Sequence, residues 1–368
     1  MQLFNAKCVA KEFVLGLLSA GVFFSSHLLH ADMTKSQTSA DEEPPYDADL
    51  FNKDKSVFFV NAEFLYWIVN EGAVDYAVKM NKPAWSTTQD TFAIGNYQNA
   101  HFEWSPGFRV NFGYFRAPHF WDVFLQYTYV PSSGRRTAHA PHSSGEFLNG
   151  TWIQPDVGSG TPPAPLEKAR CHIDLKYNVL DFLFSRRFHT NEHLRFNVFG
   201  GLTSAIIFQK MKVSYHDVNA IKSHITNRWR FEGVGFRAGM KLDWYMGYDI
   251  YLVGLLSTAA LSGWYKNSAY QKTTVSLLGS NNSRPIRNSR FHDNRLTYTA
   301  QFMIGPSWQK RFENMRTEIV LGYEMNIWTN LHQIYRSGFS APTAAKETFI
   351  NNSNISLQGL TLRLNLDF

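Results

Sequence analysis

The chain has 368 residues, of which 15% are aromatic and 18% are charged, and its formal net charge is +6. Its mean hydropathy is −0.28, and beyond residue 31 no stretch reaches the roughly 20 consecutive apolar residues that a membrane-spanning helix needs. This composition excludes a helical membrane protein. So mild a positive charge gives no reason to expect a nucleic-acid partner.

Residues 1–31 have the features of a secretory signal peptide. Lys7 and Lys11 supply the positive start, and an apolar stretch follows them. We expect cleavage near Ala31 and export by the Sec route; a retained N-terminal anchor is the alternative, although the apolar run is short for a membrane span. Removal of Cys8 with the signal leaves Cys171 as the single cysteine, so a disulfide within the mature chain is excluded.

Residues 32–56 are acidic, polar and proline-containing, which predicts a flexible periplasmic leader. From 57 to 368 the pattern has a period of two residues and recurs in segments of about ten residues, the length of a tilted transmembrane strand. Ten such segments are predicted, at 58–69, 108–114, 121–130, 171–184, 194–213, 229–244, 250–260, 296–308, 317–328 and 356–368.

One predicted segment changes phase between Val179 and Leu180, which suggests a β-bulge there. The connections alternate between brief links and long polar ones, the long ones near 70–103, 131–170, 265–295 and 329–355. Short periplasmic turns and long external loops are typical of an outer-membrane, up-and-down antiparallel β-barrel. We therefore predict about ten strands, and 12 or more if the chain near 75–97 forms another hairpin.

A soluble β-sandwich or lipocalin-like barrel also alternates with period two, but it hides its apolar side chains. Four tryptophans instead lie on the apolar register near segment ends, where an interface girdle belongs: Trp104, Trp121, Trp244 and Trp308. Three others, Trp67, Trp229 and Trp328, lie on the polar register and make the girdle imperfect. Together with the export signal, the girdle favours a membrane barrel.

The last segment alternates up to Phe368. A closing strand of this kind resembles the assembly signal of outer-membrane barrels, so we expect Phe368 to be read by the barrel-assembly machinery. The other expected partners are outer-membrane lipid, lipopolysaccharide and small solutes. The sequence leaves the oligomeric state open.

Polar side chains on the opposite register are expected to line the lumen. The candidates are Asn61, Glu63, Arg109, Asn111, Asp174, Lys176, Arg195, Arg237, Lys241, Glu318, Glu324 and Arg363. They could form a charged constriction that selects solutes by sign. The alternative is a neutralising salt-bridge network that fills a narrow barrel, because about eight strands leave room only for side chains and water-filled porins use about sixteen.

Several segments resemble the pore-forming major-outer-membrane-protein-like family of Legionella and environmental Chlamydia-like bacteria. The segments that carry the resemblance are 64–67, 74–77, 104–110, 121–122, 127–129, 199–202 and 231–239. The resemblance implies a β-barrel and a pore. The cysteine cross-linking of the classical chlamydial porin is not expected, because Cys171 stands alone.

No residue spacing indicates an enzyme, a metal or a cofactor. Loop residues such as His101, His139, His142 and His172 form no recognisable dyad or triad, so none is assigned a catalytic or metal-binding role. The arginine-rich stretch 281–295 is predicted to be an external loop, either solvated or in contact with lipopolysaccharide phosphates or a host polyanion.

These patterns predict a porin-like protein that allows passive diffusion of small solutes across the outer membrane. The alternative is a closed β-barrel that acts as a surface adhesin or an envelope structural protein. The width of the lumen distinguishes the two.

Overall fold

The computed structural model describes residues 57–72, 74–81, 95–116, 121–142, 145–152, 165–191, 193–218, 221–277, 280–312, 315–337 and 348–368. The predicted signal peptide (1–31) and leader (32–56) lie outside these residues. Within the described residues, no helix is long and apolar enough to cross a membrane.

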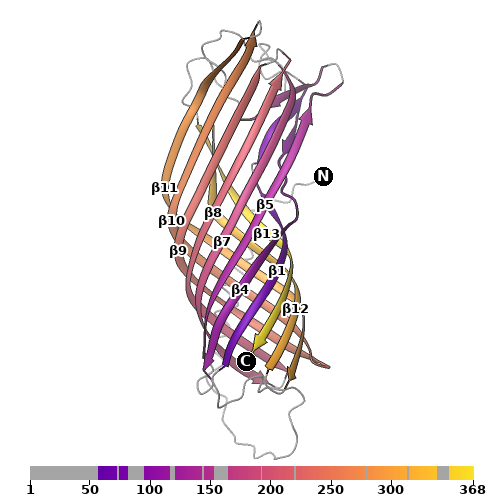
Figure 1. The fold of residues 1–368 in the computed structure, drawn as a ribbon, viewed down its shortest axis with the longest axis vertical. Helices are drawn as coiled ribbons and strands as arrows, with labels where there is room; N and C mark the ends of the chain where they lie inside the picture. The colour runs from indigo at the N-terminus through magenta and orange to yellow at the C-terminus, as the bar shows by residue number, and fades with distance from the viewer. Residues whose placement is uncertain are drawn as a thin grey trace, which may run out of the picture. The chain divides into compact units, whose positions relative to one another are not determined.

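The described chain is all-β and forms one antiparallel 13-stranded sheet, of which 10 strands close into a ring. Figure 1 shows the ring strands lying side by side and tilted. The order around the ring is β7-β5-β4-β1-β13-β12-β11-β10-β9-β8, and β8 pairs with β7 to close it. The predicted ten-stranded antiparallel barrel is therefore confirmed.

The ring strands are β1 (Val57–Glu71), β4 (Ser105–Arg116), β5 (Trp121–His139), β7 (Leu166–Asn191), β8 (Leu194–Asp217), β9 (Lys222–Gly247), β10 (Ile250–Leu277), β11 (Ser280–Phe312), β12 (Met315–Ser337) and β13 (Thr348–Asp367). Three short strands are not part of the ring: β2 (Asp75–Met80), β3 (Gly95–Asn99) and β6 (Phe147–Gly150). We call these three strands the extension. The additional hairpin considered near 75–97 thus exists, but it adds no strand to the barrel wall.

The period-two pattern places apolar side chains on the outside of the ring near the short turns. In β1, Phe58, Phe64 and Tyr66 are exposed, whereas Glu63 and Trp67, on the opposite register, are buried inside. Exposed apolar side chains of this kind recur on the neighbouring ring strands. A band this large would be unstable in water and matches the lipid-facing surface of a transmembrane barrel.

The short turns are tight where the structure describes them. Between β9 and β10, Tyr248 and Asp249 have φ angles of 54° and 63°, and Gly247 and Ile250 pair across them. Two central residues with positive φ define a type I′ turn, whose twist matches that of antiparallel strands. This end of the barrel therefore has the short connections expected at the periplasmic face.

At the opposite end, which we call the loop end, the strands are longer than predicted. β10 has 28 residues and β11 has 33, and they pair from Ile250↔Trp308 to Leu277↔Ser280. The predicted long connection at 265–295 is therefore wrong, because these residues form a strand hairpin. Arg295, assigned to that loop, is buried inside and lies over the Tyr265 ring at 3.7 Å.

A change of chemistry along each strand explains that error. In β7, Leu180, Phe182 and Phe184 face outward, but beyond them the outward side chains become polar and the inward ones become apolar, as at Ile173 and Leu175. The strand continues without a break, since its register shifts only near its two ends. The predicted bulge between Val179 and Leu180 is therefore absent. What changes there is the surroundings of the strand, from lipid to water.

Candidate functional site: the barrel interior

The centre of the barrel holds an ion cluster that we define as Glu63, Arg109, Glu324 and Arg363. The register of β4, β1 and β13 places Arg109 opposite Glu63 and Glu63 opposite Arg363. Arg109 contacts Glu63 Oε2 at 2.6 Å with Nη1 and Glu324 Oε1 at 2.7 Å with Nη2, and Arg363 Nε contacts Glu63 Oε1 at 2.6 Å. Each of these side chains is at most 9% exposed.

Neutral groups complete the hydrogen bonding of this central ion cluster. Arg109 Nε donates to Thr128 Oγ1 at 2.9 Å, and Thr361 Oγ1 donates to Glu324 Oε2 at 2.9 Å. Gln301 Nε2 donates to Glu324 Oε1 at 2.6 Å, and Arg237 donates to the amide oxygen of Gln301. The buried charges are thus paired and hydrogen-bonded, as a low-dielectric interior requires.

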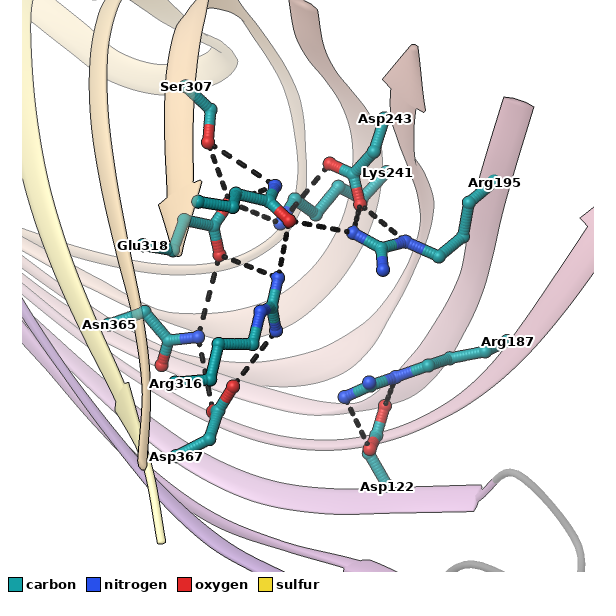
Figure 2. A network of polar contacts seen from close by, with 11 residues as sticks. Asp122, Arg187, Arg195, Lys241, Asp243, Ser307, Arg316, Glu318, Asn365 and Asp367 are labelled. Atoms are coloured by element: carbon teal, nitrogen blue, oxygen red, sulfur yellow. Dashed lines mark hydrogen bonds and ion pairs between the residues drawn. The ribbon is translucent and has the colours of Figure 1, made fainter. Parts of the chain in front are cut away.

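A second polar network lies toward the short-turn end, and Figure 2 shows it from close by. Arg195 contacts Asp243 at 2.9 Å, Lys241 lies 3.4 Å from both Asp243 and Glu318, and Ser307 donates to Glu318 at 3.2 Å. On neighbouring strands, two further ion pairs measure 3.0 Å (Arg187 with Asp122) and 2.9 Å (Arg316 with Asp367).

The described part of the lumen also contains a cavity. A cavity of about 120 Å³ lies within this second network, lined by both charged groups and apolar rings such as Phe59, Phe124 and Phe199. Asn61 and Asn111 also border it. This volume has room for several water molecules.

Toward the loop end large apolar side chains dominate the interior. Trp67 and Trp328 are fully buried, and the ring of Tyr177 packs edge-on against Trp328 with centroids 5.9 Å apart. Trp229 stacks on His332 at 4.7 Å, and His332 Nδ1 contacts a Glu71 carboxylate oxygen. The tryptophans that made the predicted girdle imperfect therefore fill the lumen.

The extension covers the inward face of the barrel strands at the loop end. Tyr215, which faces inward from β8, donates its hydroxyl to the Tyr76 carbonyl, and Trp152 Nε1 donates to the Asp75 carbonyl at 2.6 Å. The extension contributes Val74, Tyr76, Ala77, Leu148 and adjacent Trp152 to one continuous apolar cluster with the wall.

The segment that leads into β4 is held against β5. Glu103 N donates to Ser133 O at 2.9 Å, and the absent side chain of Gly134 leaves room for His101, since a Cβ there would lie 1.9 Å from the His101 carbonyl oxygen. These contacts fix residues 101–103 against β5.

The structure places most predicted lumen residues inside the barrel: Asn61, Glu63, Arg109, Asn111, Arg195, Arg237, Lys241, Glu318, Glu324 and Arg363. The prediction that Asp174 and Lys176 line the lumen is wrong. Both lie on the outside of β7, where Asp174 contacts His172 at 3.1 Å. They belong to the part of β7 beyond the apolar band, where the inward register is the apolar one.

Sequence reasoning missed two cationic members of the short-turn network. Arg187 and Arg316 fell in predicted connections, yet both lie on ring strands. The signal was available, because Arg187 continues the register of Ser185, and Arg316 continues that of Glu318. Alternation that persists past an apolar segment marks a longer strand.

The four predicted girdle tryptophans are all exposed on the outside of the barrel. Trp121, Trp244 and Trp308 lie near the short turns, and Trp104 lies near the loop side, where it stacks on Tyr66 at 5.4 Å. Phe368 is exposed beside them, and its backbone N–H donates to the Phe58 carbonyl at 2.9 Å. Among the described residues, no group of three or more His, Cys, Asp or Glu side chains is placed to hold a metal.

Solved structures with a related outline are outer-membrane proteins. The outer membrane protease OmpT from Escherichia coli matches with 9% identity and a TM-score of 0.37, over 85% of this chain and 96% of that one. A Pseudomonas aeruginosa FadL homologue matches with 7% identity and a TM-score of 0.28, over 86% and 90% of the two chains. Likenesses this weak carry no conclusion about function.

A comparison with the curated proteins finds no match. The family model described as Legionella pneumophila major outer membrane protein precursor matches residues 52–368, which include every strand of the barrel. This agrees with the resemblance found in the sequence motifs. The chain belongs to the Legionella major outer membrane protein family and is an outer-membrane β-barrel.

Proposed function

We propose that this protein serves the outer membrane as a closed β-barrel, a structural or surface protein that does not conduct solutes in this conformation. The observation that carries the proposal is the filled lumen. Its ion networks, its buried tryptophans and the extension follow one another from the short turns to the loop end. A ring of 10 strands is also much narrower than the roughly 16 strands of a water-filled porin.

Opening such a lumen would be costly. Separating one member of a buried, hydrogen-bonded charge pair costs about 3–5 kcal/mol, because its partner stays in a low-dielectric site. The central ion cluster joins four charged side chains on four neighbouring strands, so a passage there requires several pairs to break together.

Single-channel recording of the purified protein in planar bilayers tests the proposal. We expect no stable conductance step of the size that a porin gives under the same conditions. Folding of the same sample is checked by its β-rich circular dichroism. A steady, reproducible conductance from the folded protein would contradict the closed barrel and support the pore.

Passive diffusion of small solutes is the second candidate, and the cavity at the short-turn end favours it. If the protein conducts, this cavity is the starting point of the path, and its charges set the selectivity. The sequence predicted a charged constriction that could select solutes by sign, but each inward cation described here has a carboxylate partner. Reversal potentials of Arg109→Glu and Arg237→Glu variants across a salt gradient test whether these residues act as the filter.

We further propose that the chain is exported by the Sec route and that it is not an enzyme. Dependence of export on residues 1–31 tests the first part. Assays of the folded protein with peptide and phospholipid substrates test the second.

A further inference from the structure

A cationic surface lies on the outside of the barrel, directly beyond the apolar band on the loop side. It consists of Lys176 on β7, Lys210 and Lys212 on β8, Arg228 and Arg230 on β9, and Lys266 on β10. Figure 1 shows these four strands side by side as they run to the loop end. We call this set of six residues the cationic belt.

Strand register brings the members of the belt close together. Lys210 lies directly opposite Arg228, and Arg230 lies directly opposite Lys266. Lys176 joins the second row through Phe208, which pairs with both Lys176 and Arg230. Cβ atoms of directly opposed residues lie roughly 4.5–5.5 Å apart, and like charges placed there destabilise a sheet. The belt therefore does not contribute to the stability of the fold.

Few carboxylates neutralise this surface. Glu232 pairs with Arg230, and Asp174, which lies directly opposite Lys210 on the neighbouring strand, pairs with His172. Among the described residues, no ion pair connects Lys176, Lys210, Lys212, Arg228 or Lys266 to a carboxylate. This contrasts with the interior, where every cation described above has an acidic partner. The excess charge of the belt is available to an anion from outside.

The same strands carry an apolar surface immediately below the belt. Leu180 and Phe182 on β7, Ile206 on β8, and Val234 and Phe236 on β9 all face outward and are 41–73% exposed. They lie four to eight residues from the belt members of the same strand, on the side of the short turns. A molecule that binds the belt and remains in the membrane must therefore have anionic groups at its head and acyl chains below.

We propose that the cationic belt binds the phosphorylated headgroup of lipopolysaccharide in the outer leaflet, with the acyl chains packed on the apolar surface below it. The belt lies on the loop side of the band, which is the external side of an outer-membrane barrel. Lysine and arginine make short, charge-assisted hydrogen bonds to phosphate oxygens. Several such groups on a rigid sheet bind the two ends of a diphosphorylated headgroup without reorganising the backbone.

The proposed site differs from the arginine-rich stretch that the sequence suggested for lipopolysaccharide. Arg295 of that stretch faces the interior, where it contacts Asp293 and Gln333. The proposal also stands independently of whether the barrel conducts, because it concerns the outer surface.

The test uses the folded full-length protein, with lipopolysaccharide binding measured by native mass spectrometry and by titration in detergent. The belt variant is Lys210→Glu with Arg228→Glu. The matched control is Arg186→Glu with Lys310→Glu, which changes net charge equally but lies at the short-turn end. We expect the belt variant to bind lipopolysaccharide at least about tenfold more weakly, while the control retains wild-type affinity and all three proteins keep the same circular dichroism and melting temperature.

Three further ligands identify the source of the anion. Enzymatically dephosphorylated lipid A and deacylated lipopolysaccharide are each expected to bind the wild type much more weakly than the intact lipid. Equal binding of the dephosphorylated lipid, or equal loss in the belt and control variants, would overturn the proposal. Preferred binding of heparin or of the deacylated sugar would also overturn it, in favour of a soluble polyanion.

Discussion

At the scale of single residues, the interior of this barrel is governed by the cost of burying charge. Arg109 is the pivot, because its guanidinium contacts both Glu63 and Glu324. Two carboxylates so near one another repel unless a cation lies between them. The planar guanidinium, with donors on several sides, suits this position better than a lysine.

This reasoning predicts a large effect of Arg109→Leu. The substitution leaves Glu63 and Glu324 buried with reduced compensation, so we expect unfolding in urea to become easier by about 3–5 kcal/mol. The matched control is Arg230→Leu, which removes an arginine–glutamate pair on the outside whose arginine is 51% exposed. Exposed pairs contribute about 0–1 kcal/mol. Equal losses in the two variants would show that the centre is hydrated and open.

Phe368 carries a prediction of a different kind. Its backbone donates to Phe58, but its side chain lies on the outside and is 59% exposed. A Phe368→Ala substitution should therefore change the stability of the folded barrel by no more than about 1 kcal/mol, and yet reduce the amount inserted in the outer membrane if the assembly machinery reads this residue. Fractionation of the envelope measures insertion, and unchanged levels would remove the assigned role.

At the scale of strands, the same alternation has opposite meanings in the two halves of β7. Near the short turns Phe182 faces lipid and Asp181 faces the lumen, whereas farther along Lys176 faces out and Leu175 faces in. The part of the lumen that lies beyond the membrane is an ordinary apolar core, because water surrounds the outside of the barrel there. Only the part of the barrel in the membrane has apolar side chains outside and polar side chains inside.

The inversion is testable within this one strand. We expect Phe182→Arg to impair assembly, because an arginine at the lipid face costs about 2–4 kcal/mol near mid-bilayer. Leu175→Asp should impair it as well, since it buries a charge without a partner in the apolar cluster. Lys176→Gln should assemble normally. Heat-modifiable gel mobility and circular dichroism report folding, and a tolerated Leu175→Asp would place that side chain in water instead.

The alternation predicted the number of ring strands and the lipid-facing side because, across the whole thickness of a membrane, every outward side chain has to be apolar. Phe64, Phe112 and Leu364 all follow it, and all are exposed outside. The ends of the strands were not predicted correctly, because outward side chains no longer have to be apolar beyond the membrane surface. Past Leu180 the reversed chemistry was read as a bulge, and past Trp264 it was read as a loop, although both strands continue.

The contents of the lumen were less predictable than its wall. Glu63, Arg109 and Arg363 could be assigned to the inside from their register, but their pairing depends on which strands are neighbours around the ring. The contact of Arg109 with Glu324 joins residues 215 positions apart. The packing of the extension against Tyr215 likewise follows from topology, which the local pattern of Asp75–Met80 does not contain.

At the scale of the whole barrel, two kinds of interior share one wall. The short-turn part is a membrane barrel with paired charges inside, and the loop-end part is a water-exposed barrel with an apolar core and the extension inside. The transition between the two kinds of interior coincides with the loop-side edge of the apolar band and with the cationic belt. The outer half is therefore expected to be as rigid as the membrane half.

Amide hydrogen exchange of the protein in micelles or nanodiscs tests this rigidity. We expect the outer halves of β8, β9 and β10, measured in peptides covering 206–216, 222–232 and 264–274, to exchange at least about a hundredfold more slowly than an unstructured chain. Their backbone groups are paired in register, and Ile207, Phe231 and Tyr265 anchor them to the apolar core. Peptides covering 234–242, within the apolar band, are the internal reference. Exchange at the rate of an unstructured chain in the outer halves would mean that these segments are loops, and the seal at the loop end, on which the closed-barrel proposal depends, would be lost with them.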